Sequence, residues 1–112
     1  MEITIEKEGR IHVAKLKGDF DLGDETKLAE QLQPLILEPN ARVAVEMSQL
    51  KQINSLGLSE LINAVVRARM NKSRLVLAAP SAFVMGVFEV TRLNNWFEIV
   101  PTLEAAKKSL LA

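Results

Sequence analysis

The strongest constraint on the fold is an apolar strand pattern followed closely by the pattern of an amphipathic helix. Residues 42–47 form a short, Val-rich apolar segment, as expected of a largely buried strand. After them, apolar residues recur with helical spacing while polar residues occupy the other side. These apolar residues are Leu58, Leu61, Ile62 and Val65. A second apolar run, 75–79, is closed by Pro80. Strands separated by a helix of this length predict a βαβ crossover and parallel strands.

The remaining segments extend this pattern in both directions. Alternation at residues 3–5 and 11–16, with a turn at 8–10, predicts an N-terminal hairpin. We expect Asp24 to cap a first helix and Ser81 to open a third, which Asn94 and Asn95 end. A short strand at 97–100 and a last helix from about residue 103 complete the chain. The sequence thus predicts one α/β domain, residues 1–112. It has a mixed, mostly parallel sheet of about four to five strands, an N-terminal antiparallel hairpin and about four helices.

Composition excludes several classes of protein. The chain has fourteen basic and fourteen acidic residues, so its net charge gives no general attraction to nucleic acid or to a membrane. A basic group near the end of the second helix is interpreted as solvated and helix-stabilising. It consists of Arg67, Arg69, Lys72 and Arg74. The chain has no cysteine, which excludes disulfides and thiolate sites. There is no signal-peptide pattern and no long apolar run, and we expect a cytoplasmic protein.

Ser55 is the most distinctive candidate for function. It lies where the apolar strand gives way to the amphipathic helix, so it is at or just before a helix start. A phosphate there would meet unpaired backbone N–H groups and the positive end of the helix dipole. The simpler interpretation is a helix cap, because Asn54 and Ser55 are both preferred capping residues. Both interpretations remain open from the local pattern.

Two motifs resemble those of the bacterial anti-sigma-factor antagonists, which are single-domain STAS proteins. Residues 46–50 followed by 53–58 resemble the family's strand, turn and Asp-Ser-Ser/Thr/Ala-Gly-Leu motif. Residues 18–21, with Thr26 and Leu28 after them, resemble the Gly-Glu-Leu-Asp stretch before the family's first helix. The resemblance covers the order of elements from about residue 3 to residue 110, and the motif around Ser55 is its most specific part. It implies a STAS-like single domain over residues 1–112.

The resemblance also implies a partner-switching mechanism. In that family the unphosphorylated antagonist binds an anti-sigma factor that is also a serine kinase. Phosphorylation breaks the complex, and a serine phosphatase restores it. Carried over by position, the phosphoacceptor is Ser55, and the partner-binding residues are Asp21, Asn54, Ser55, Leu56 and Gly57. No cofactor and no metal are expected on this chain, because ATP and Mg²⁺ belong to the kinase. We expect a monomer or a weak dimer, with no direct contact to nucleic acid or membrane.

Two departures from the family motif keep an alternative open. The family's usual Asp is Asn54 here, and the small residue after the acceptor is Leu56. Loss of the carboxylate reduces repulsion toward a phosphate but removes a contact for the kinase. The alternative is a STAS subunit bound constitutively in a larger assembly, such as a transport ATPase or a sensory complex, without phospho-switching. A weaker alternative is a homodimer that buries Phe83, Met85 or Trp96.

The sequence shows no catalytic set, and we expect no enzyme. His12 is the only histidine, lies in a predicted strand and is far in sequence from Ser55, so no triad is visible. The acidic residues between positions 19 and 25 lack the spacing of a calcium loop.

Overall fold

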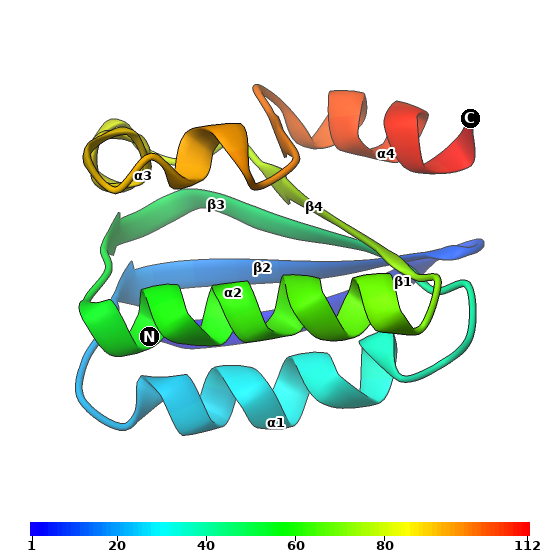
Figure 1. Ribbon diagram of the computed structural model, residues 1–112, viewed down its shortest axis with the longest axis horizontal. Coiled ribbons are helices and arrows are strands. Elements are labelled where there is room, and N and C mark those ends of the chain that lie inside the picture. Colours follow the sequence, from blue (N-terminus) through cyan, green and yellow to red (C-terminus); the bar gives the residue numbers. More distant parts are fainter.

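A central five-stranded sheet carries helices on its two faces. The computed structural model describes all 112 residues, and Figure 1 shows the arrangement. The strands are β1 (Glu2–Glu8), β2 (Ile11–Asp19), β3 (Arg42–Gln52), β4 (Arg74–Ala78) and β5 (Ile99–Val100). The helices are α1 (Asp24–Ile36), α2 (Ser55–Met70), α3 (Ala82–Val90) and α4 (Leu103–Leu111), with a short 3₁₀ turn, η1 (Leu93–Asn95). The predicted fold class and order of elements are confirmed.

The strands lie in the order β1-β2-β3-β4-β5. The hairpin pair β1–β2 is antiparallel, and the other three pairs are parallel. The carboxyl ends of β2, β3 and β4 therefore lie at the same end of the sheet. The loop after β2 and the turn after β3 share that end, as the sequence predicted.

Alternation along the strands divides the apolar residues between two cores. One set packs beneath α1 and α2, which lie side by side in Figure 1, and it includes residues of α3. Its strand members are Ala14, Leu16, Val43, Val45, Met47, Leu50, Leu75 and Leu77. The other set packs against α4 on the opposite face: Ile11, Val13, Ala44, Val76, Ala78, Ala106 and Leu110. Burial on both faces explains why the central strands read as continuous apolar runs.

The ends of β3 and α3 differ from the sequence expectation. β3 continues past Met47 to Gln52, pairing with β2 beyond the point where β4 ends. α3 ends at Val90 rather than at Asn94 and Asn95. The backbone turns at Arg92, which has a φ of 62°, and η1 follows.

The capping role predicted for Asp24 is wrong. Gly23, with a φ of 96°, occupies the position before α1, and no side chain caps this helix. Asp24 is the first helical residue, and its carboxylate accepts a hydrogen bond from the Asp21 N–H outside the helix. A left-handed backbone at that position favours glycine, which explains why the chain has glycine rather than a capping side chain there. By contrast, Ser81 does open α3, because its hydroxyl accepts from the Val84 N–H.

Candidate functional site

Ser55 is the first residue of α2 and is exposed. The capping role belongs to its neighbour: Asn54 has extended backbone angles, and its side-chain oxygen accepts from the Gly57 N–H at 2.8 Å. The Ser55 hydroxyl makes no hydrogen bond within the protein. The two roles left open for this turn are therefore divided between two residues, since Asn54 caps the helix and the Ser55 hydroxyl stays available to solvent.

The start of α2 is electrostatically suited to an anion on Ser55. The first turn contains no acidic residue. The N–H groups of Ser55 and Leu56 precede the first intrahelical bond, which joins the Leu58 N–H to the Asn54 carbonyl. These free donors and the helix dipole together favour negative charge at this position.

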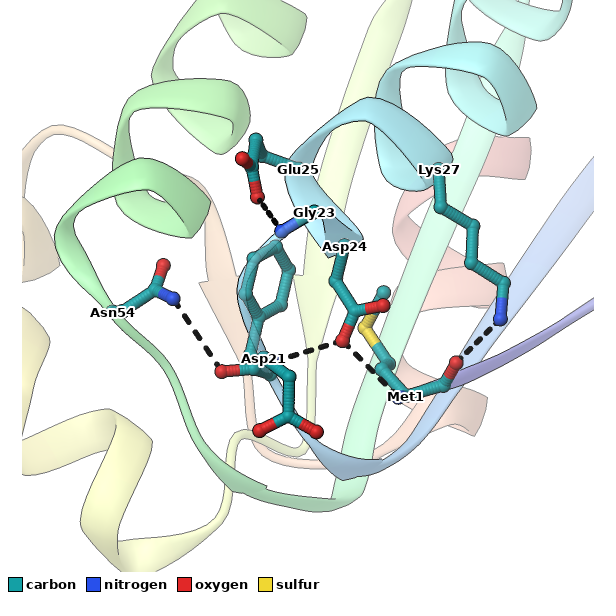
Figure 2. Close-up of polar contacts among 8 residues, drawn as sticks. Met1, Asp21, Gly23, Asp24, Glu25, Lys27 and Asn54 are labelled. Carbon is teal, nitrogen blue, oxygen red and sulfur yellow. Dashed lines mark hydrogen bonds and ion pairs between the residues drawn. The ribbon is translucent and has the colours of Figure 1, made fainter.

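The loop after β2 lies against this turn. The Phe20 N–H donates to the Gln52 carbonyl at 3.3 Å, and the Asn54 amide donates to the Phe20 carbonyl at 3.5 Å. Figure 2 shows Asn54 facing the loop that carries Asp21. Asp21 is exposed, and its carboxylate makes no hydrogen bond within the protein. The structure thus brings Asp21, Asn54 and Ser55 to one end of the sheet without pairing Asp21 directly to either.

Gly57 lies beneath this surface rather than on it. A Cβ atom at this position would lie 2.8 Å from Cγ1 of Ile53 and 2.9 Å from two ring atoms of Phe20. Both distances are closer than carbon atoms tolerate. Gly57 is fully buried, and its lack of a side chain lets the Phe20 ring pack directly against the first turn of α2. Gly57 was expected among the partner-binding residues, but the structure places it beneath the surface, where it lets the loop after β2 pack closely on the turn after β3.

Exposed apolar side chains surround the site. Leu56 is 45% exposed, so it faces solvent rather than the core. Leu22, in the loop after β2, is 86% exposed. Leu22 has no helical or strand periodicity around it, and the signal that could have identified it is an apolar residue within the polar run 19–25.

Two further residues that the sequence analysis did not assign to the site help to build it. Phe20 supplies the ring under Gly57, and its position between Asp19 and Asp21 gave no periodic signal. Ser81 donates its hydroxyl to the Leu50 carbonyl at 2.7 Å, which fixes the start of α3 against the end of β3. Both contacts depend on tertiary structure and have no local sequence pattern.

The start of α1 closes the far side of the loop. Asp24 accepts hydrogen bonds from the Asp21 N–H at 2.8 Å and from the Met1 amino group at 3.1 Å (Figure 2). Hydrogen bonding from the Asp21 N–H is the main cause that lowers the pKa of Asp24 below its usual value. Partial burial of the carboxyl opposes this shift, while the Met1 amino group and Lys27 reinforce it. The charged carboxylate therefore stabilises the loop that carries Asp21.

The basic group expected near the end of α2 is partly engaged in structure. The Arg69 guanidinium lies 4.6 Å from the centre of the Trp96 ring and donates to the Trp96 carbonyl. Arg74 donates to the Ser109 carbonyl and pairs with Glu98. Two of the four cations therefore fasten α2 and β4 to later elements. No set of three or more His, Asp and Glu side chains is arranged to hold a metal ion, and no helix is long and apolar enough to cross a membrane.

Known proteins are similar to this chain in sequence and in fold. A family model described as "Mlab, STAS domain" matches residues 3–102. The BtrV protein of Bordetella bronchiseptica, whose name assigns it provisionally as an anti-sigma factor antagonist, is 26% identical over 106 residues. That match covers 95% of this chain and 91% of BtrV.

Solved structures share the fold at lower identity. An anti-sigma factor antagonist from Mycobacterium paratuberculosis has a TM-score of 0.87 and 16% identity, covering 99% of this chain and 94% of its own. The Bacillus cell fate determinant SpoIIAA in its phosphorylated form has a TM-score of 0.76 and 19% identity, and the match covers 97% of this chain and 99% of SpoIIAA. SpoIIAA in its unphosphorylated form has a TM-score of 0.82 and 20% identity, and the match covers 97% of this chain and 96% of SpoIIAA.

Proposed function

Because the chain belongs to the STAS domain family, we propose that it is an anti-sigma-factor antagonist whose binding surface is centred on Ser55. The protein acts as a binding module rather than as an enzyme. It binds an anti-sigma factor that is also a serine kinase, and phosphorylation of Ser55 ends the complex until a serine phosphatase removes the phosphate. The similarity to BtrV and to phosphorylated SpoIIAA supports this proposal.

One structural observation carries the proposal. Ser55 is exposed at the first position of α2 while Asn54 supplies the cap, so phosphorylation need not break the helix. A phosphate would add about two negative charges. It would sit beside Leu56, while Leu22 lies in the loop after β2 at the same end of the sheet, and exposed apolar surface of this kind suits a protein partner. Desolvating that charge in an apolar interface is unfavourable, which explains how the modification would release the partner.

A second candidate is the constitutive subunit, and the surface of α3 favours it. Phe83 and Val90 are 57% and 86% exposed, and they border a depression of about 390 Å³ with Ala82, Gly86 and Val87. Permanent interfaces are more apolar than transient ones. Asn54 in place of the family's Asp is also consistent with a site that is not phosphorylated.

The two candidates are separated by phosphosite mapping of the protein from its native cells together with capture of its partner. We expect a phosphate on Ser55. The wild type and Ser55→Ala should capture a kinase-like ATPase, and Ser55→Asp should not. Ser59→Asp is the matched control, because Ser59 is exposed on the same helix one turn later. Absence of phosphate under all growth conditions, with the same partner held by Ser55→Asp, would reject the switch in favour of the constitutive subunit.

A further inference from the structure

A second concave site lies at the amino ends of β2 and β3, at the opposite end of the sheet from Ser55. It has a volume of about 370 Å³. The end of β1, the turn between β1 and β2, and the connection between α1 and β3 form its walls. These segments meet at the right of Figure 1, away from the start of α2. Small-molecule sites commonly have volumes of roughly 300–1,000 Å³, so the cavity can hold a small ligand.

The cavity concentrates positive charge in a chain of zero net charge. Lys7, Arg10 and Arg42 line it, against one carboxylate, Glu38. None of these four groups belongs to an ion pair within the protein. Arg42 donates a guanidinium N–H to the Leu110 carbonyl, so its guanidinium lies against α4, none of whose residues line the cavity. Lys7 and Arg10 are therefore the cations available to a ligand, against the single carboxylate of Glu38.

His12 adds an unpaired polar atom to the same cavity. Its ring lines the wall, and its Nδ1 atom is buried without a hydrogen-bond partner. Buried polar atoms are almost always hydrogen-bonded, because leaving one unpaired costs free energy. Protein atoms cover Nδ1, so it marks an unsatisfied part of the cavity wall rather than a direct contact for a ligand.

We propose that this cavity binds a small anion carrying a phosphate group. Lysine and arginine side chains donate charge-assisted hydrogen bonds to phosphate oxygens, and arginine does so with matched planar geometry. Here Lys7 comes from β1 and Arg10 from the turn after it, so two cations from the hairpin border the same concave volume. The two cations border a single small depression rather than a long stripe, which favours a compact ligand over a nucleic-acid strand or a membrane surface.

The ligand site is independent of the function proposed for Ser55. It uses no residue of the turn after β3, and its cations are separated from Ser55 by the length of β3. A test at this cavity therefore succeeds or fails regardless of whether Ser55 is phosphorylated.

The test is a nuclear magnetic resonance titration of the full chain with inorganic phosphate, compared with sodium chloride at equal ionic strength. We expect saturable shifts of the Gly9, His12 and Asn40 backbone resonances with phosphate only. The double variant Lys7→Gln/Arg10→Gln should weaken binding by about tenfold or more, because two charge-assisted contacts are lost. Glu38→Gln should tighten binding by about threefold, since it removes the one opposing charge.

The controls distinguish a built site from general attraction of anions. Lys51→Gln removes an exposed cation at the other end of β3 and should leave phosphate binding unchanged. Lys7 and Arg10 are exposed and unpaired, so the double variant should keep the wild-type fold and spectrum elsewhere. Shifts that never saturate, that chloride reproduces, or that persist in the double variant with unchanged affinity would overturn the proposal.

Discussion

At the scale of single residues, the site depends on close packing as much as on exposed chemistry. Neither Gly57 nor Asn54 is a candidate for modification, yet both fix the start of α2 against the loop after β2. Ser55 is then held at a defined position on a rigid helix end. Precise placement of an exposed hydroxyl thus results from buried neighbours.

Gly57→Ala should destabilise the protein by about 1–3 kcal/mol, the usual cost of overpacking. The added methyl would meet Ile53 and Phe20, and neither has free space to move into. Urea denaturation measures the difference. Gly86→Ala is the matched control within α3, because nothing lies within 4 Å of its added Cβ atom. There, alanine should be neutral or stabilise by about 0.5–1 kcal/mol through helix propensity. Equal effects at both glycines would contradict the packing argument.

Asn54→Ala should cost about 1 kcal/mol through loss of the helix cap. Asn54→Asp should keep most of that stability, since a carboxylate also accepts from the Gly57 N–H and suits the helix dipole. Thermal or urea unfolding of both variants provides the comparison. A loss in Asn54→Asp as large as that in Asn54→Ala would show that the weak contact to the Phe20 carbonyl, rather than the cap, holds the turn.

At the scale of elements, sequence patterns identified the strands and helices but misplaced several ends. The polar residues Ser48, Gln49, Lys51 and Gln52 concealed the second half of β3. They are exposed because β4 pairs with β3 only as far as Glu46, so the rest of β3 lies beside β2 alone. The spacing of apolar residues reflects burial. Where a strand extends beyond the end of its neighbour, its residues are exposed and the apolar pattern is lost.

For the candidate site, the sequence predicted which residues lie together but not the role that each one has. The family motif located Ser55, Asn54 and Asp21 at one end of the sheet, because parallel strands bring their carboxyl ends together. The division of roles between Asn54 and Ser55 could not be read from sequence, since both residue types cap helices. The contacts of Phe20 and Ser81 join segments about thirty residues apart, and no local pattern records them.

The start of α1 gives a pH-dependent prediction. The pKa of Asp24 is lowered mainly by the hydrogen bond from the Asp21 N–H, so its charged form is favoured in the folded state. The resulting stability is fully present above the usual aspartate pKa, and it is lost as pH falls through the lowered value. Asp24→Asn should therefore be less stable than the wild type at neutral pH, with the difference shrinking as the pH falls below the usual aspartate pKa.

Denaturation measured across this pH range tests the argument. Asp19→Asn is the control, because Asp19 is exposed and its carboxylate makes no hydrogen bond within the protein. A pH profile for Asp24→Asn that matches the one for Asp19→Asn would mean that the hydrogen bonds to Asp24 contribute nothing.

At the scale of the whole molecule, charge balance makes a single phosphate easy to detect. The net charge is zero at pH 7, so phosphorylation of Ser55 would change it to about −2. Isoelectric focusing of protein from native cells should therefore resolve a second, more acidic band that phosphatase removes. Ser55→Ala should show only the original band, and an acidic band that survives this substitution would place the phosphate elsewhere.

The two edges of the sheet have a consequence for how copies of the molecule meet. β1 exposes Glu2, Glu6 and Glu8, and β5, at the other edge, has only two residues. Strand-to-strand stacking of copies along β1 would set glutamates against glutamates, which is unfavourable, and β5 offers almost no backbone to extend. The molecule is therefore protected from templated fibre growth, even while it carries exposed leucines at the Ser55 end.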